Sequence, residues 1–316
     1  MFRLLALALA AASLAATAYG AEVAYYPLPN DAYPHDVAPA ADGAVWYSGQ
    51  HLGVLGRFDP KTQKSEHIPL GPHSAPHGVI IGPDRAIWLT DGGQNAIVRV
   101  DPLSRAVRVL PLPSSFPNAN LNTAVFDPAG VLWFTGQSGV YGRIDPVASK
   151  VEAWRSPKGA GPYGITSTPT GEVWYASLAG DHIARIEGPE GGATVIDPPR
   201  PGVGPRRIWS DSHGMLWVSF WNSGEIGRYD PGAGAWKTWS LPNSKSGCYA
   251  IYVDDRDRVW VSDWTANAIL RFDPKIEMFV SFPSNRTRAD IRQLAGRPGE
   301  VWAGETGTDR LAVVRE

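Results

Sequence analysis

The sequence predicts an all-β fold, a seven-bladed β-propeller of four-stranded blades. Seven tryptophans recur 41 to 45 residues apart along the 316-residue chain: Trp46, Trp88, Trp133, Trp174, Trp217, Trp260 and Trp302. Each lies in the same succession of short apolar runs and turns, and the chain is rich in turn-forming residues, with 34 Gly and 28 Pro. Four short strands in each unit of ~40–45 residues are typical of a propeller blade.

The second copy shows the elements of one blade in order. An apolar strand over residues 79–81 is followed by a turn at Pro83-Asp84 and by a strand that contains Trp88. A third strand ends in an Arg-x-Asp-Pro motif at residues 99–102, where Asp-Pro is turn chemistry. A fourth strand ends on the apolar run at residues 109–112. Since no segment has a sustained apolar period of 3.6, we expect few helices.

The seventh copy ends at Glu316, after its third strand. Residues 23–29, Val-Ala-Tyr-Tyr-Pro-Leu-Pro, match the fourth-strand endings of the other copies. We therefore predict that this N-terminal strand completes the last blade and closes the ring, which leaves no exposed sheet edge. The propeller is then a single domain over residues 22–316.

The first residues have the pattern of a secretory signal. Met1-Phe2-Arg3 precedes a Leu/Ala-rich run to Ala18 that is shorter than the ~20 residues of a membrane span. We predict a signal peptide over residues 1–20 and an exported, periplasmic or secreted protein without stable membrane insertion; an uncleaved anchor is the alternative. The single Cys248 excludes an internal disulfide. A net charge of −2 argues against a nucleic-acid partner, and we expect a monomer.

One polar position recurs at the start of each innermost strand, eleven residues before the Trp, or ten in the seventh copy. It is occupied by His35, His77, Asn122, Tyr163, Arg206, Tyr249 and Arg292. Since inner strands line the channel of a propeller, these side chains are expected to converge at one funnel. Convergent polar groups in a concave site are the default candidate for binding or catalysis. The alternative is that they only hydrogen-bond to each other around a water-filled channel.

The residue types of this ring suit several roles. The histidines are candidates for base, acid or metal ligand, and the arginines for holding a carboxylate or polarising a carbonyl. The tyrosines offer hydroxyls and flat faces to aromatic ligands. The acidic residues nearest to these positions are Asp36, Asp91, Asp263 and Glu305.

Several sequence motifs of the chain resemble those of one known family, that of virginiamycin B (streptogramin B) lyases. The matching segments are Pro76-His77-Gly78-Val79, Ile87 to Asp91, Gly161 to Thr166 and Asn267 to Arg271, and the resemblance extends from about Tyr25 onward. It implies a seven-bladed propeller that opens a cyclic depsipeptide antibiotic by elimination of its ester, with a Mg²⁺ ion. It also implies that His77 is the catalytic base and His35 a second catalytic histidine.

The sequence departs from the family at two acidic positions. Ala75 occupies a place where the family has Glu, and the acid nearest to the second position is Asp91. Asp91 is therefore the candidate Mg²⁺ ligand of an altered metal site, and Arg206 and Arg292 are alternative sources of positive charge. The expected substrate-binding residues are Asn122, Tyr163, Arg206, Tyr249 and Arg292.

Three functions stay open at this point. The first is a lyase-like enzyme for an ester-linked, small-molecule substrate. The second is a metal-dependent lactonase, which requires a cage of carboxylates and amides on the axis; Asn122 and Asp91 are its candidates. The third is an exported propeller that binds a ligand or a protein without catalysis, since a fold does not fix a function.

Overall fold

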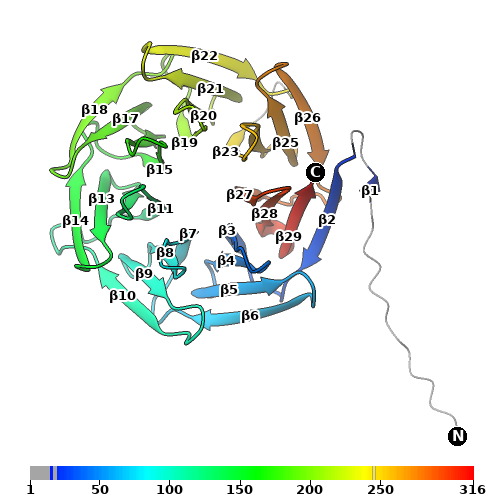
Figure 1. Cartoon of the computed structure of the whole chain (residues 1–316), viewed down its shortest axis with the longest axis horizontal. Helices are drawn as coiled ribbons and strands as arrows, with labels where there is room; N and C mark the ends of the chain where they lie inside the picture. The colour runs from blue at the N-terminus through cyan, green and yellow to red at the C-terminus, as the bar shows by residue number, and fades with distance from the viewer. Residues whose placement is uncertain (1–14, 17–19, 244, 246) are drawn as a thin grey trace, which may run out of the picture.

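The computed structural model describes residues 15–16 and 20–316, with the exception of 244 and 246. Its seven antiparallel sheets are arranged as blades around a central axis, with the first strand of each blade innermost (Figure 1). Within these residues the one helix is the 3₁₀ turn η1 (Thr306–Thr308). The predicted seven-bladed, all-β propeller is confirmed.

The blades follow one another in chain order. Blade 1 contains β3 (Pro34–Pro39), β4 (Val45–Gly49), β5 (Val54–Asp59) and β6 (Lys64–Pro69). Blade 2 contains β7 (Pro76–Ile81), β8 (Ile87–Asp91), β9 (Ala96–Val100) and β10 (Val107–Pro111). Blade 3 contains β11 (Leu121–Phe126), β12 (Leu132–Gly136), β13 (Val140–Asp145) and β14 (Lys150–Arg155). Blade 4 contains β15 (Pro162–Ser167), β16 (Val173–Ser177), β17 (His182–Glu187) and β18 (Gly192–Ile196).

The remaining blades have the same plan. Blade 5 contains β19 (Pro205–Ser210), β20 (Leu216–Phe220), β21 (Glu225–Asp230) and β22 (Ala235–Ser240). Blade 6 contains β23 (Cys248–Val253), β24 (Val259–Asp263), β25 (Ala268–Asp273) and β26 (Met278–Pro283). Blade 7 contains β27 (Ile291–Arg297), β28 (Glu300–Glu305), β29 (Arg310–Arg315) and the N-terminal β2 (Glu22–Pro27).

The N-terminal strand closes the ring as predicted. β2 pairs with β29 along its whole length, from Glu22 opposite Arg315 to Pro27 opposite Arg310 (Figure 1). The short β1 (Ala15–Ala16) pairs with the outer edge of β2. Most of the predicted signal peptide lies outside the described residues. In the part of the chain that is described, no helix has the length and apolarity needed to cross a bilayer.

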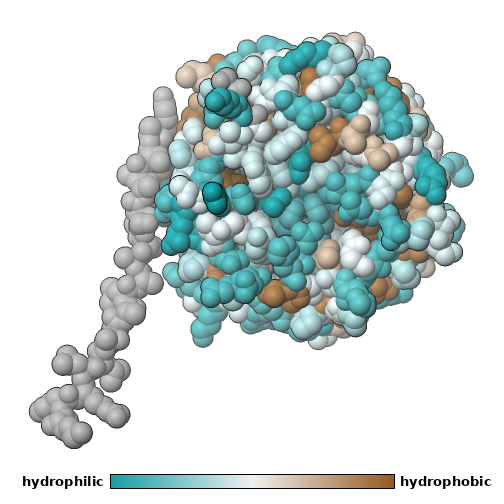
Figure 2. Space-filling model, turned by 180° about the vertical axis from the view of Figure 1, so that it is seen from behind, coloured by the Kyte–Doolittle hydropathy of each residue, from teal (hydrophilic) through white to brown (hydrophobic). Residues whose placement is uncertain are grey.

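The hydrophobic core lies between neighbouring blades. One cluster, for example, joins Trp46 and Leu55 of blade 1 to Leu89 and Val98 of blade 2. The seven repeated tryptophans are all buried, at 5% exposure or less, as wedges in these interfaces. On the face shown in Figure 2, hydrophobic residues are scattered among polar ones. The repeated tryptophans therefore stabilise the contacts between neighbouring blades.

Candidate functional site

The seven polar residues of the predicted ring occupy the second position of the seven innermost strands. Each of these innermost strands has a shift in its pairing register with the second strand of the same blade, close to its first residue, as in a β-bulge. In β19 the bulge turns two consecutive side chains to the same place: the guanidinium carbons of Arg206 and Arg207 lie 4.3 and 5.1 Å from the ring of Tyr163. The ring therefore has a second polar layer directly beneath it.

Hydroxyl groups of the second strands hold these bulges in place. Ser48 accepts a hydrogen bond from the backbone N–H of Asp36 (3.0 Å) and donates one to the carbonyl of His77 in the next blade (2.6 Å). The hydroxyl of Thr90 does the same between Gly78 N–H (2.8 Å) and the carbonyl of Asn122 (2.5 Å). The backbone of one ring residue is thus fixed by the preceding blade.

Two histidines meet in the ring. The ring centroids of His35 and His77 are 3.9 Å apart, and Asp36 Oδ1 lies 2.8 Å from His35 Nδ1. Burial, and after it the charges of Arg292, Arg207 and Arg206, holds the pKa of His35 well below its usual range. Burial and the neighbouring His35 likewise hold the pKa of His77 well below its usual range, against the raising effect of Asp36. Both imidazoles are neutral at pH 7.

A chain of directed hydrogen bonds fixes the tautomer of His77. A guanidinium only donates, so Arg207 Nη1 donates to Thr123 Oγ1 (2.5 Å). The Thr123 hydroxyl in turn donates its hydrogen bond to Asn122 Oδ1 (2.8 Å). The amide nitrogen of Asn122 therefore faces His77 Nε2, at 3.2 Å, and donates to it. His77 must carry its proton on Nδ1, a buried atom for which the described residues provide no partner.

The tautomer of His35 is the opposite one. Its Nδ1 faces the carboxylate of Asp36, which only accepts, so the proton lies on Nδ1 and the lone pair on Nε2. None of the described residues hydrogen-bonds to this Nε2. An Asp that orients a His in this way leaves the far nitrogen free to accept a proton. The site therefore offers a base at His35 and a hydrogen-bond donor at His77.

Cations and aromatic rings alternate on the other side of the ring. The guanidinium carbon of Arg206 lies 4.3 Å from the ring of Tyr163 and 3.8 Å from that of Tyr249, and Arg206 Nη2 donates to the hydroxyl of Tyr163 (2.5 Å). Arg292 donates to the hydroxyl of Tyr249 (3.3 Å). Burial alone would raise the pKa of Tyr249, but the charges of Arg206, Arg292 and Arg207 outweigh it and lower that pKa. The burial of Tyr163 and, after it, the neighbouring Tyr249 raise the pKa of Tyr163.

Positive charge exceeds negative charge on the axis. Three guanidiniums, of Arg206, Arg207 and Arg292, act on His35, and the carboxylate of Asp36 lies 3.4 Å from Arg207 Nη2. Arg206 and Arg292 have no ion-pair partner among the described residues. A site with this imbalance attracts an anion, and guanidinium groups suit a carboxylate in particular.

Asp91, the expected metal ligand, serves a loop of its own blade. Its two oxygens accept hydrogen bonds from the hydroxyl of Ser74 (2.5 Å), the backbone of Ala75 (2.9 Å) and the side chain of Gln94 (2.9 Å). Among the residues that the structure describes, three side chains of metal-ligand type come together, those of His35, Asp36 and His77, whose potential ligand atoms lie within 4.8 Å of one another.

This cluster does not fit a Mg²⁺ ion. Mg²⁺ takes oxygen ligands in octahedral geometry, whereas two of the three donors are imidazoles. The carboxylate of this cluster, that of Asp36, already accepts the Nδ1–H of His35 and pairs with the guanidinium of Arg207. Three nearby guanidiniums add electrostatic repulsion toward a dication.

Four residues of the site were missed by the sequence reasoning. Arg207 and Thr123 are third in their strands, which alternation would place away from the axis, and only the bulge turns them inward. Trp221 and Trp264 pack on the ring from above, 4.8 Å from Arg206 and 4.7 Å from Arg292. A signal for the last two was present, because each lies four residues after a blade tryptophan, in blades 5 and 6 alone.

Closed blades, an N-terminal closing strand and a polar ring on the axis define a seven-bladed propeller with a polar site at one end of its channel. The chain belongs to the virginiamycin B lyase family, whose model matches residues 65–316. His35 and Asp36 precede the matched residues. No curated protein matches the chain.

Solved structures agree with this fold. Virginiamycin B lyase from Staphylococcus aureus is 21% identical, with 94% of this chain and 99% of that one covered and a TM-score of 0.86. A catalytically inactive variant of the S. aureus lyase, solved with quinupristin, is 20% identical over 94% and 99% of the two chains, with a TM-score of 0.85. YCF48 bound to D1 peptide is 16% identical over 96% and 98%, with a TM-score of 0.75.

Proposed function

We propose that this chain is a carbon–oxygen lyase that opens an ester-linked, cyclic depsipeptide-type substrate by elimination at the axial ring. The observation that carries the proposal is the pairing of two neutral, oppositely oriented imidazoles with guanidiniums that lack a counter-ion. Family membership and the structural likeness to streptogramin B lyases support the substrate class.

In this proposal the hydrogen bonds make His35 the base and His77 a hydrogen-bond donor. His35 Nε2 takes the proton from the carbon next to the one that bears the ester oxygen. The electron pair of that C–H bond becomes a C=C bond, and the C–O bond breaks with its electrons on the oxygen. The product mass is unchanged because no water is added. The resemblance implied His77 as the base, but Asn122 occupies its Nε2, so His77 acts as a donor through Nδ1–H.

Arg206 and Arg292 receive the departing carboxylate in this proposal. Guanidinium groups that are already fixed on aromatic faces need little reorganisation when negative charge develops, which is the basis of electrostatic preorganisation. Because the ring carries this charge itself, we expect turnover without a divalent ion.

The test is turnover of a streptogramin B antibiotic, followed by mass spectrometry with and without EDTA. We expect a linear product of unchanged mass in both conditions, and at least a ~100-fold loss in His35→Asn. His182→Asn, which changes a buried histidine in blade 4 away from the axis, is the matched control and is expected to retain activity. A product heavier by one water would indicate a hydrolase, and turnover that stops with EDTA would contradict the arginine assignment.

A second candidate, a binding propeller without catalysis, is favoured by one observation. Six of the seven ring residues are at most 9% exposed, so the ring side chains themselves fill this end of the channel. A propeller of similar fold, YCF48, is described with a bound peptide. Saturable binding of a streptogramin by the folded protein with no product of any mass would favour this candidate over the lyase.

We also propose that the chain is exported. The support is the N-terminal leader pattern, in which Met1-Phe2-Arg3 precedes a Leu/Ala-rich run. Fractionation of expressing cells with N-terminal sequencing tests this. A mature protein that begins near residue 21 is expected, and an intact leader on a membrane-bound protein would contradict it.

A further inference from the structure

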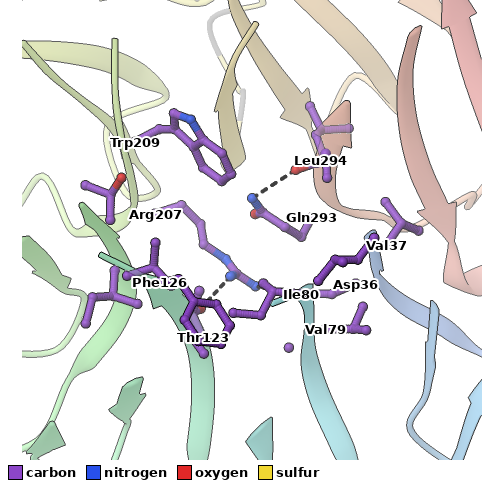
Figure 3. Close-up of a pocket in the computed structure, with 17 residues that line it drawn as sticks. Asp36, Val37, Val79, Ile80, Thr123, Phe126, Arg207, Trp209, Gln293 and Leu294 are labelled. Carbon is purple, nitrogen blue, oxygen red and sulfur yellow. Dashed lines mark hydrogen bonds and ion pairs between the residues drawn. The ribbon is translucent and has the colours of Figure 1, made fainter. Parts of the chain in front are cut away.

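The channel is hollow on the far side of the Asp36–Arg207 layer. A cavity of about 300 Å³ lies there between the inner strands of the blades, and we name it the turn-side pocket because these strands run on to the turns of that face. Its walls are mainly apolar, and its polar groups include Asp36, Thr123, Arg207 and Gln293. In Figure 3 the side chains of Arg207 and Gln293 extend into the middle of the channel from opposite sides.

The pocket opens on the face opposite the ring. In β7 the exposure rises along the strand, from the buried Val79 to the half-buried Ile80 and Ile81. Phe126 and Trp209, which lie further along β11 and β19, are also half-buried. At the other end the Asp36–Arg207 pair, 2% to 5% exposed in its side chains, closes the channel. A molecule would therefore enter between the turns, without passing the histidines.

Two residues that line the pocket, Gln293 and Arg207, each have a buried polar atom with no partner among the described residues. Both protons of the Gln293 amide nitrogen are used, by the carbonyls of Ile251 (3.2 Å) and Leu294 (3.1 Å). This fixes the amide orientation and leaves Oε1 as an acceptor with no donor among the described residues. Arg207 uses Nη1 and Nη2 for Thr123 and Asp36, and its Nε–H has no acceptor. Unpartnered buried groups of this kind are costly unless something binds them.

We propose that the turn-side pocket binds a small, uncharged aromatic molecule that carries a carboxamide. The carboxamide N–H donates to Gln293 Oε1 and its carbonyl accepts from Arg207 Nε–H. The ring lies between the apolar walls near Phe126 and Trp209. An uncharged ligand is required because Asp36 already balances Arg207. The size fits, since a cavity of about 150 Å³ holds benzene and this one has about twice that volume.

The proposal does not rest on the lyase assignment, and its probe is 4-fluorobenzamide, followed by ¹⁹F NMR titration of the full chain. With about ten non-hydrogen atoms, the probe is expected to bind with a Kd on the order of 0.1–1 mM. Ala295→Phe fills the pocket from its wall without removing a polar contact and is expected to abolish binding. Gln293→Leu removes the acceptor and is expected to weaken binding about five- to tenfold.

Fluorobenzene is the matched probe without a carboxamide, and we expect Gln293→Leu to bind it as well as the wild type does. Circular dichroism checks that each variant is folded; if Gln293→Leu is not, Ala295→Phe and the pair of probes still decide. Failure of 4-fluorobenzamide to saturate the folded wild type at 10 mM would overturn the proposal. So would binding that survives in Ala295→Phe, or equal affinity for the two probes. Loss of streptogramin turnover in His35→Asn leaves all of these outcomes unchanged.

Discussion

The neutral histidine pair makes a specific prediction for stability against pH. His35 and His77 are buried, and burial with the facing guanidiniums keeps the pKa of each well below its usual value in the folded state. In the unfolded chain each titrates near pH 6.5. Below that pH the unfolded state binds protons that the folded state does not, so the free energy of unfolding falls as the pH falls. Above it neither state binds a proton and the pair contributes no slope.

The size of the effect follows from proton linkage. Each neutral histidine contributes a slope of about 1.4 kcal/mol per pH unit between its unfolded pKa and its folded one, so the pair contributes about 2.7 kcal/mol per pH unit. The double variant His35→Asn, His77→Gln removes both titrating groups. Asn at 35 retains a donor toward Asp36, and Gln at 77 retains an acceptor for Asn122. His67 and His182, whose pKa values are also lowered by burial, remain in both proteins and cancel in the difference.

The assay is urea unfolding of wild type and double variant between about pH 5 and 8. We expect the difference between the two free energies of unfolding to be constant above pH 6.5 and to change by about 2.7 kcal/mol per pH unit below pH 6. His213→Asn is the control, because that side chain is 75% exposed and lies away from the axis. Parallel curves for wild type and double variant below pH 6 would refute the neutral-pair assignment.

Three further predictions concern the frame of the site. Ser48→Ala removes the partner of Asp36 N–H and of the His77 carbonyl, and we expect urea unfolding to show a loss of about 1–3 kcal/mol; an unchanged value would contradict the hydroxyl link. Deletion through Pro27 removes β2 and leaves β29 an unpaired edge, so calorimetry should show a lower Tm and light scattering should show aggregation; a Tm equal to that of the full chain would argue against closure by β2. Burial raises the pKa of the Cys248 thiol, so a thiol reagent should react at the rate of unfolding, and immediate reaction of the native protein would contradict this.

The sequence by itself determined the blade count, the closing strand and the positions of the ring. These depend on local relations: a strand, a turn and a second strand have nearly constant length, so the residue ten or eleven before a buried Trp is the second residue of the inner strand. For the same reason the sequence predicts an outer strand at residues 23–29, and in the structure β2 covers Glu22–Pro27.

The tertiary structure decided what the ring can do. Bulges bring Arg207, Asp36 and Gln293 to the axis from positions that simple alternation would turn away, and the backbone N–H groups of Arg207 and Asp36 are held there by the hydroxyls of Ser219 and Ser48. The proton on His77 is set by a chain that starts at Arg207, 84 residues from Thr123. These relations exist only after the ring has closed and blades 1, 2, 3 and 5 face one another across the channel. The direction of a hydrogen bond between distant residues depends on this contact between blades, so local sequence patterns do not predict it.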